Sequence, residues 1–364
     1  METCVDFFSC LDHDTLWKIL MCLEDPSDLV RVGSVSRTWR RFVIANGLCK
    51  QLCLRMFPCF HRVDRVIEPN CGMENPSEVG CSKSVEWETL KREHRVYAFL
   101  AQGFTSFALR ECVSDAISAS STDNYPEESI HNTLQPGDRV ARRPSYWSSK
   151  GQSDPAVPET LTYKLVADLC VITEISVQPF QAFFQWGSPI YSAKSVRFRM
   201  GHPKAPVDDP MGEACDSCAD DSFIWTYTSP EFAMAQENRL QKFKLPEPVL
   251  CIGGILQIEL LGRIQRQEMD GLFYICISHV QVMGRPLSPA FGVEILEPSG
   301  KFVLKAQSYT QPSLPENEQC SFPNAYLEGR VRDLEQIVNL LRGQGVVVEY
   351  DWNGGDDLDE DMAL

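Results

Sequence analysis

Seven apolar runs between residues 160 and 284 place the strongest constraint on the fold of this chain. Gly, Pro, Asp and Ser separate the runs, and no helical pattern of ten residues lies between them. Within one run, Val196, Phe198 and Met200 alternate with Arg197 and Arg199, which predicts a strand with one buried and one solvated face. Such runs favour an antiparallel β-sandwich over an α/β sheet. The runs span residues 160–167, 169–180, 194–200, 222–228, 239–245, 255–262 and 272–284.

Helical spacing marks the N-terminal residues instead. Leu16, Ile19 and Leu20 share one face of a predicted helix, and either Asp12 or Asp14 can cap its start. The apolar face of this helix must be covered by something.

Two further short helices are predicted before Gly47. Pro26 interrupts the first pattern, Ser27 or Asp28 can then cap a second helix, and residues 34–43 begin a third. Three short helices within about forty residues bury little apolar surface among themselves. Either a partner protein or the larger domain that follows must cover them, and periodicity alone leaves both alternatives open.

The segment LDHDTLWKILMCLEDPSDLVRVGSVSRTWRRFV, residues 11–43, resembles the F-box. It contains a leading Leu, a helix rich in Leu and Ile, a Pro-X-Asp-Leu turn and the pattern Val-Ser-Arg-X-Trp-Arg. The family usually opens with Leu-Pro, whereas Asp12 follows Leu11 here. The resemblance implies that these helices bind a Skp-type adaptor, which connects an F-box protein to a cullin-based SCF ubiquitin ligase.

Eight side chains match the apolar positions of this motif. The sequence does not tell whether each contacts the adaptor or forms the core of the box. Residues 29–60 also carry six basic side chains and no acidic one, which could steer an acidic partner or simply form a solvated helix face. The predicted adaptor-binding residues are Leu11, Leu16, Ile19, Leu20, Leu29, Val32, Val35 and Trp39.

A second resemblance covers about residues 120–287. The segment SYWSSKG precedes the first strands, and GGILQIELLGR and YICISHVQVMGRPL follow later, an order similar to that of a galactose-binding-like or discoidin-type jelly roll. In those folds, loops at one end of the sandwich hold ligands. The predicted target-binding residues on such loops are Trp147, Trp186, Tyr191, Gln265 and Asp270, although Trp147 is also a candidate for the core.

The whole chain is therefore predicted to be an α+β multidomain protein, and residues 64–84 are predicted to form a loop before a helix at 85–104. Its predicted segments are an F-box helical domain at 1–60, a linker with a connecting helix at 61–103, a β-sandwich for target recognition at 104–290, a hairpin and amphipathic helix at 291–350, and an acidic disordered tail at 351–364.

This organisation resembles a plant-type F-box protein with a C-terminal sandwich. The resemblance implies a non-catalytic substrate-recognition subunit of an SCF-type ubiquitin ligase, which binds an unidentified target protein through the sandwich. One alternative is a carbohydrate-binding module that reads glycosylated proteins. Another is an enzyme with an incidental helical cap, which a deep pocket with clustered titratable groups would favour.

Motifs for other chemistry are missing from the sequence. It has no phosphate-binding loop, dinucleotide fingerprint, His-Glu-X-X-His or Gly-X-Ser-X-Gly, so no cofactor and no catalytic residue is predicted. The pair Cys215 and Cys218 is half a zinc site at most, and no metal site is predicted. A net charge of −16 disfavours nucleic acid as a partner. No segment indicates a membrane span or signal peptide, and we expect an intracellular protein of the nucleus or cytoplasm with reduced thiols.

Overall fold

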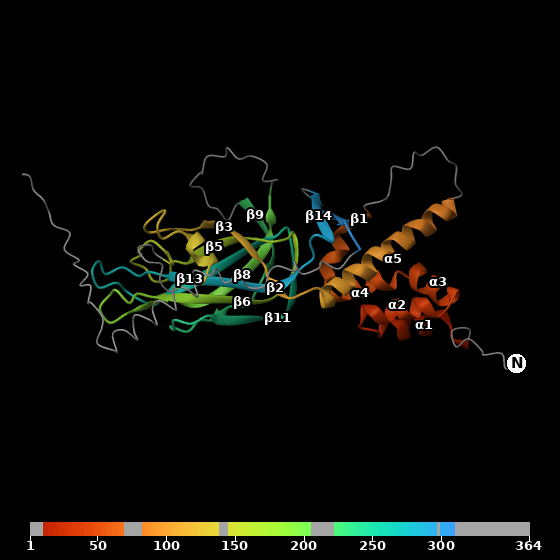
Figure 1. The fold of residues 1–364 in the computed structure, drawn as a ribbon, viewed down its shortest axis with the longest axis horizontal. Coiled ribbons are helices and arrows are strands. Elements are labelled where there is room, and N and C mark those ends of the chain that lie inside the picture. Colours follow the sequence, from red (N-terminus) through yellow and green to blue (C-terminus); the bar gives the residue numbers. More distant parts are fainter. Residues whose placement is uncertain (1–9, 69–81, 138–144, 205–221, 297–298, 310–364) are drawn as a thin grey trace, which may run out of the picture. The chain divides into compact units, whose positions relative to one another are not determined.

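A computed structural model describes residues 10–68, 82–137, 145–204, 222–296 and 299–309 of the chain (Figure 1). Short helices form its N-terminal part, and antiparallel sheets form most of the part that follows. This confirms the predicted fold class of a small helical segment followed by an antiparallel β-sandwich.

Aspartate side chains cap the first two helices. Asp12 caps α1, as one of the two predicted alternatives, and Asp25 caps α2 in place of the predicted Ser27 or Asp28. The difference arises because α2 begins at Pro26, and a proline at the first helical position sacrifices no backbone hydrogen bond. The N-terminal helices are α1 (His13–Met21), α2 (Pro26–Val35), α3 (Arg37–Ala45) and α4 (Leu48–Met56).

A long helix, α5 (Ser82–Ser106), completes the helical part and packs against α2, α3 and α4. Tyr97 and Leu100 of α5 are fully buried in the same apolar core as Leu16 and Leu29. The same core continues to residues of the strands, including Phe302. The chain itself therefore covers one side of the short helices. This agrees with the alternative in which the part of the chain that follows covers them.

Two six-stranded antiparallel sheets form the β-sandwich. The first has the order β10-β8-β12-β5-β3, with β9 paired to β8. The second has the order β11-β6-β13-β2, with β4 paired to β13 and β7 paired to β6. The strands are β2 (Arg110–Glu111), β3 (Val113–Ala119), β4 (Trp147–Ser148), β5 (Glu159–Leu165), β6 (Leu169–Gln181), β7 (Ile190–Tyr191), β8 (Ala193–Pro203), β9 (Phe223–Thr228), β10 (Phe232–Ala233), β11 (Gln241–Ile252), β12 (Ile255–Arg263) and β13 (Cys276–Pro286).

Alternating side chains build the core between the two sheets. Phe198 and Met200 of β8 are fully buried, and they share one apolar core with Ile175 of β6 and Val282 of β13. The intervening Arg199 of β8 lies outside that core, and its Nη1 is 3.4 Å from Oε1 of Glu259 on β12. The alternation predicted for this strand is therefore confirmed.

Strand β3 is absent from the sequence prediction. Its register against β5 shifts between Val113 and Asp115 and again between Ala116 and Ser118. Each shift breaks the two-residue alternation by which a strand is found in a sequence, so β3 has no clear pattern of its own.

A small sheet of three strands has the order β1-β15-β14, with β1 (Val63–Ile67), β14 (Phe291–Leu296) and β15 (Lys301–Ala306). The antiparallel pairing of β14 with β15 forms the predicted hairpin. Strand β1 pairs in parallel with β15, so the prediction of a loop from residue 64 is wrong for residues 64–67. The predicted C-terminal helix, the acidic tail and the pair Cys215 and Cys218 lie outside the described residues.

Candidate functional site

The start of α1 is fixed by the residue that stands where the F-box family usually has proline. The Asp12 carboxylate accepts hydrogen bonds from the Thr15 hydroxyl, at 2.7 Å, and from the Thr15 backbone N–H, at 2.9 Å. These bonds hold the pKa of Asp12 below its ordinary value. Asp12 therefore supplies a helix cap in place of the rigid proline turn.

The predicted adaptor-binding residues fall into two groups in the structure. Leu16, Leu20 and Leu29 are buried in the helical core. Three more are half-buried against that core, namely Leu11, Val32 and Trp39. These six side chains mainly stabilise the box, and only their exposed parts are available to a partner.

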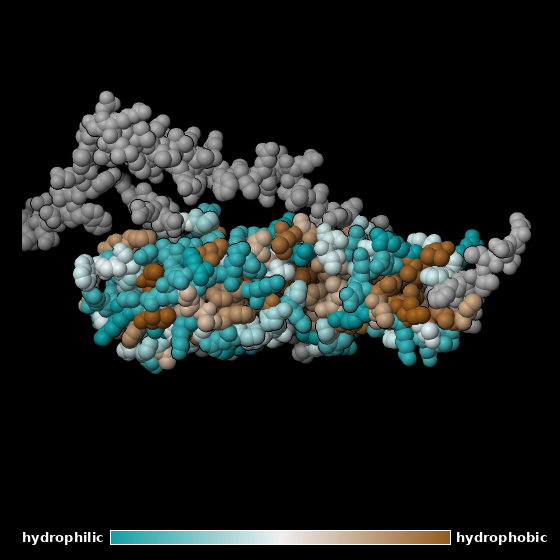
Figure 2. All heavy atoms as spheres, turned by 90° about the horizontal axis from the view of Figure 1, so that it is seen from below, coloured by the Kyte–Doolittle hydropathy of each residue, from teal (hydrophilic) through white to brown (hydrophobic). Residues whose placement is uncertain are grey.

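The second group projects into solvent from α1 and α2. Ile19 and Val35 are exposed, with 63% of Val35 accessible. Sequence reasoning missed Trp17 and Val30, which are also exposed on the same two helices. Figure 2 shows hydrophobic surface gathered over the N-terminal helices on the face in view. We use the name apolar helix face for the exposed apolar side chains of α1 and α2, which are Trp17, Ile19, Val30 and Val35. Their exposure depends on which side of α1 and α2 the helices α4 and α5 pack against. No local sequence pattern predicts that side.

Several basic side chains of this region have partners within the chain. Arg55 donates hydrogen bonds to backbone carbonyls at the end of α1, including one of 2.7 Å to Leu23. Lys50 forms an ion pair of 3.1 Å with Glu93. These two residues contribute to helix packing. They are therefore less available to steer an acidic partner than the predicted role for all six basic residues required.

Arg37 and Arg40 line a groove of about 510 Å³ beside Val30 and His94. Burial, and then the nearby positive charge of Arg40, lowers the pKa of His94. This groove therefore has a positive field next to the apolar helix face.

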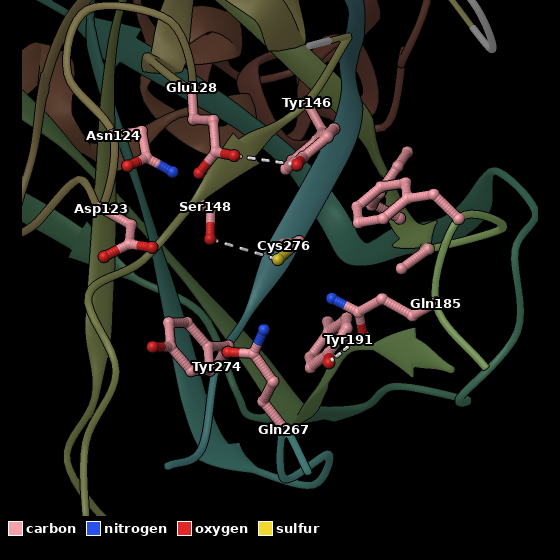
Figure 3. Close-up of a pocket in the computed structure, with 13 residues that line it drawn as sticks. Asp123, Asn124, Glu128, Tyr146, Ser148, Gln185, Tyr191, Gln267, Tyr274 and Cys276 are labelled. Carbon is pink, nitrogen blue, oxygen red and sulfur yellow. Dashed lines mark hydrogen bonds between the residues drawn. The ribbon is translucent and has the colours of Figure 1, made fainter. Parts of the chain in front are cut away.

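A second cavity, of about 210 Å³, lies where loops of the β-sandwich meet (Figure 3). We call it the loop-end pocket. Figure 3 shows Asp123, Asn124 and Glu128 on one side of it and Gln185 and Tyr191 on the opposite side. Its lining residues are Asp123, Asn124, Glu128, Tyr146, Ser148, Phe180, Ala182, Phe184, Gln185, Tyr191, Gln267, Tyr274 and Cys276.

Aromatic rings form much of its wall. Tyr146 stacks on Phe180 with a centroid distance of 3.8 Å, and Tyr191 meets Tyr274 edge to face at 6.3 Å. These rings come from different loops and strands, so each contact joins segments that are far apart in the sequence.

Behind the pocket, a buried ion pair connects the loops that form it. The Arg263 side chain is fully buried and pairs with Glu159. It also donates to the Ser149 hydroxyl at 2.9 Å and to the Phe273 carbonyl at 2.9 Å. Glu159 in turn accepts a hydrogen bond of 2.8 Å from the Ser121 hydroxyl. This ion pair thus connects three segments of the chain. They are the segment before Asp123, the segment after Ser148 and the segment before Tyr274.

The sequence-predicted target residues lie at or near this pocket, with one exception. Tyr191 lines the pocket, and Asp270 accepts a hydrogen bond of 2.5 Å from the Tyr274 hydroxyl. Trp186 and Gln265 do not line it, although Trp186 follows the lining residue Gln185 and Gln265 is two residues before the lining residue Gln267.

Trp147 is the exception, because it is fully buried in the sandwich core and offers no surface to a ligand. Its indole N–H donates to the Ser121 carbonyl at 3.0 Å. Large aromatic side chains fill the cores of sandwiches, which explains why Trp147 points inward while its neighbours Tyr146 and Ser148 line the pocket.

Sequence reasoning missed Asp123, Asn124 and Glu128. They lie in a polar loop that carries no ligand motif, and the sequence gives no sign that this loop meets the strand containing Cys276. The only available signal was the Asn-Tyr-Pro turn within the loop, which here contains a cis peptide bond before Pro126.

The electrostatics of the pocket are dominated by acidic groups. Burial, and then the Asp270 carboxylate, raises the pKa of Asp123, while Lys150 acts in the opposite direction. Burial raises the pKa of the Cys276 thiol to about 12, so this thiol is protonated at neutral pH. In the part of the chain that the structure describes, the lining residues include no Lys or Arg.

Two further features concern the described part of the chain. Its His, Cys, Asp and Glu side chains form no group of three or more that could hold a metal ion. Among its helices, none has the length and apolar character needed to cross a membrane.

Comparison with known proteins identifies the helical segment and the whole chain. The F-box-like family matches residues 8–55. An F-box protein of Arabidopsis thaliana, At4g00755, is 50% identical over 371 residues, which cover 99% of this chain and 98% of that protein. The chain belongs to the F-box protein family. The resemblance of residues 11–43 to the F-box is therefore confirmed.

Solved structures similar to this F-box protein include carbohydrate-binding modules and a lectin. The family 32 module of Clostridium perfringens NanJ, in complex with galactose, has 12% identity and a TM-score of 0.29 over 46% of this chain and 98% of that one. The family 32 module of Streptococcus pneumoniae EndoD has 10% identity and a TM-score of 0.31 over 48% and 98%. A fucolectin from striped bass has 9% identity and a TM-score of 0.30 over 49% and 48%. At these TM-scores the similarity carries no conclusion about ligands.

Proposed function

We propose that this F-box protein is the substrate-recognition subunit of an SCF-type ubiquitin ligase. Its N-terminal helices bind a Skp-type adaptor, and the loop end of its sandwich binds a target protein. The chain then acts in the nucleus or cytoplasm by bringing the target close to the ubiquitin-conjugating enzyme, and it contributes no nucleophile of its own.

The observation that carries the proposal is the apolar helix face. Leu16, Leu20 and Leu29 are buried inside the chain, whereas Ile19 and Val35 on the same two helices remain exposed. An exposed apolar face on a helical unit of this family is a surface for a partner. Covering each of its four side chains is worth on the order of 1 kcal/mol, because each is already partly buried.

A second set of exposed apolar side chains supports target binding at the loop end of the sandwich. The four most exposed large hydrophobic side chains among the described residues are Met269, Trp186, Tyr125 and Phe184, with exposed fractions of 93%, 90%, 78% and 70%. All four lie in loops that contribute residues to the loop-end pocket. Tyr, Trp, Phe and Met are the side chains enriched in protein interfaces. We call these four residues, three aromatic side chains and one Met, the aromatic rim.

The test is binding of a purified Skp-type adaptor to the full chain, with Val35→Asp as the variant. Val85→Asp is the matched control, because Val85 on α5 is 62% exposed and Val35 is 63% exposed. We expect Val35→Asp to weaken adaptor binding by about tenfold or more, since a charge replaces an apolar contact. The control is expected to bind as the wild type does.

Equal adaptor binding by the wild type, Val35→Asp and Val85→Asp would refute the proposed face. Absence of binding by a folded wild-type chain would refute the proposed function. Leu29→Ala is a poor variant for this purpose, because truncating a fully buried leucine costs about 2–5 kcal/mol of folding free energy.

A second candidate function is carbohydrate binding by the loop-end pocket. Asn124, Gln185 and Gln267 line the pocket together with the Tyr191 and Tyr274 rings. Amide groups beside aromatic rings suit the hydroxyls and apolar faces of sugars. Titration with galactose, fucose and N-acetylglucosamine, followed by calorimetry, tests this candidate, and the absence of heat at millimolar sugar would refute it.

A further inference from the structure

The loop-end pocket combines acidic side chains with aromatic walls, and no Lys or Arg occurs among the described residues that line it. Asp123 and Glu128 contribute carboxylates, and Tyr146, Tyr191 and Tyr274 contribute rings. A third carboxylate, that of Asp270, is hydrogen-bonded to the Tyr274 hydroxyl. Among the described residues, Lys150 acts electrostatically on Asp123 and Arg266 on Asp270, and neither of these two cations lines the pocket.

Hydrogen bonds hold the backbone of the acidic loop and the Glu128 carboxylate in place. The Asp123 backbone N–H donates to the Ser148 carbonyl at 3.0 Å, and the Ser148 N–H donates to the Glu128 carbonyl at 3.3 Å. Glu128 is nearly buried, and its Oε1 accepts a hydrogen bond of 2.9 Å from the Tyr146 hydroxyl. The loop therefore presents its acidic groups from a fixed backbone.

The negative charge of the Asp123 carboxylate is the one that no hydrogen bond within the described residues stabilises. The carboxylate accepts no hydrogen bond from any described residue, and although Asp123 is exposed, partial desolvation and the negative charge of Asp270 raise the pKa of its carboxyl. A carboxylate in this position is destabilised by lost hydration and by repulsion, and a cation placed between it and Glu128 would remove both effects.

The aromatic walls favour the same type of ligand. A Lys ammonium or Arg guanidinium is attracted to the face of a tyrosine ring by about 0.5–2 kcal/mol, depending on how far the site is dehydrated. A neutral sugar would satisfy hydrogen bonds here but would leave the negative charges unpaired.

We propose that the loop-end pocket binds the cationic side chain of a Lys or Arg residue in the target protein, while apolar neighbours of that residue pack on the aromatic rim. The inference rests on the proposed function, since it names the chemistry of the target that the receptor recognises. It assigns Asp123 and Glu128 as the groups that select for positive charge.

The test uses the full chain, both alone and mixed with the adaptor, and four fluorescein-labelled peptide libraries. The libraries share random flanking positions enriched in apolar residues and differ only at a fixed central residue, which is Arg, Lys, Gln or Glu. Fluorescence anisotropy measures the affinity of each. We expect the Arg or Lys library to bind at least tenfold more tightly than the Gln library, and the preference to weaken as salt is added.

Two variants and a control identify the site. Asp123→Asn and Glu128→Gln keep the shape of the side chains and are expected to remove most of the preference for Arg or Lys over Gln. Glu86→Gln makes the same change in charge at an exposed position of α5 and is expected to keep the preference. A preference that survives in both pocket variants, or an equal affinity for all four libraries, would overturn the proposal.

The outcomes separate this inference from the proposed function. Adaptor binding without any preference for basic peptides leaves the receptor role intact and overturns only the ligand class. A preference for basic peptides in a chain that does not bind the adaptor supports the pocket chemistry and refutes the receptor role. Saturable binding of galactose without binding of any peptide library would overturn the cationic ligand in favour of a sugar.

Discussion

Replacing Arg263 with leucine is expected to damage both the stability of the sandwich and the shape of its loop-end pocket. The Arg263 side chain is fully buried and pairs with Glu159, whose side chain is 3% exposed. It also donates to the Ser149 hydroxyl and to the backbone carbonyls of Lys150, Val157 and Phe273, at distances between 2.8 and 3.1 Å. Arg263→Leu removes every one of these bonds.

The loss in the free energy of unfolding follows from the buried charge of Glu159, which remains after the substitution. Glu159 keeps its hydrogen bonds from the Ser120 and Ser121 hydroxyls, but its charge stays buried without a cation. Leaving one partner of a buried ion pair costs about 3–5 kcal/mol. We expect Arg263→Leu to lower the free energy of unfolding by this amount. The double variant with Glu159→Leu should lose less than the sum of the two single variants, because it removes the orphaned charge.

Urea unfolding followed by near-ultraviolet circular dichroism measures these differences. Arg239→Leu is the control, since Arg239 forms an exposed ion pair with Glu237 and its loss is expected to cost no more than about 0.5 kcal/mol. A loss below about 1 kcal/mol for Arg263→Leu would refute the reasoning, because a pair worth so little could not hold the pocket loops together.

Two further predictions concern titratable groups of the pocket. Affinity for the Arg or Lys library is expected to fall on acidification, because burial and the Asp270 carboxylate raise the pKa of Asp123 above its ordinary value of 3.8 while Lys150 opposes them. Asp123 therefore gains a proton, and loses its attraction for a cation, at a higher pH than an aspartate with the ordinary pKa does. Anisotropy titrations between about pH 7 and pH 4 check this, and an affinity constant over that range would contradict it. The raised pKa also means that the ionised Asp123 costs stability as pH increases above 3.8. Alkylation by iodoacetamide is expected to be much slower at Cys276, whose pKa is raised to about 12 by burial, than at the exposed Cys22. Peptide mass spectrometry measures both rates, and equal rates in the folded chain, with denatured chain as control, would show that Cys276 is not protected.

Local periodicity predicted those parts of the fold that depend on neighbouring residues. The alternation of Val196, Phe198 and Met200 identified β8, and the spacing of Leu16 and Leu20 identified α1, because each pattern is a property of one element. Strand β1 had no such pattern. It exists through its pairing with β15, which lies more than two hundred residues later in the chain.

The candidate site was predicted less completely for the same physical reason. Leu16 and Ile19 both match apolar positions of the F-box, yet the packing of α4 and α5 decides that one is buried and the other exposed. Tyr191 lines the loop-end pocket and Asp270 is hydrogen-bonded to the lining residue Tyr274, and their role in target binding stays a prediction. Asp123 and Glu128 could not be predicted, because closure of the sandwich brings their loop to Tyr274 and no local sequence signal encodes that approach.

The central claim is that one chain holds an adaptor and a target at the same time. The direct measurement immobilises a Skp-type adaptor, captures the full chain on it, and then records binding of the peptide library with central Arg or Lys. The account predicts that captured wild-type and Val85→Asp chains bind the peptide, that Val35→Asp chain is captured about tenfold more weakly or worse, and that bound peptide does not release the chain. Failure of the adaptor to capture the wild-type chain, or release of the chain when peptide binds, would contradict the account.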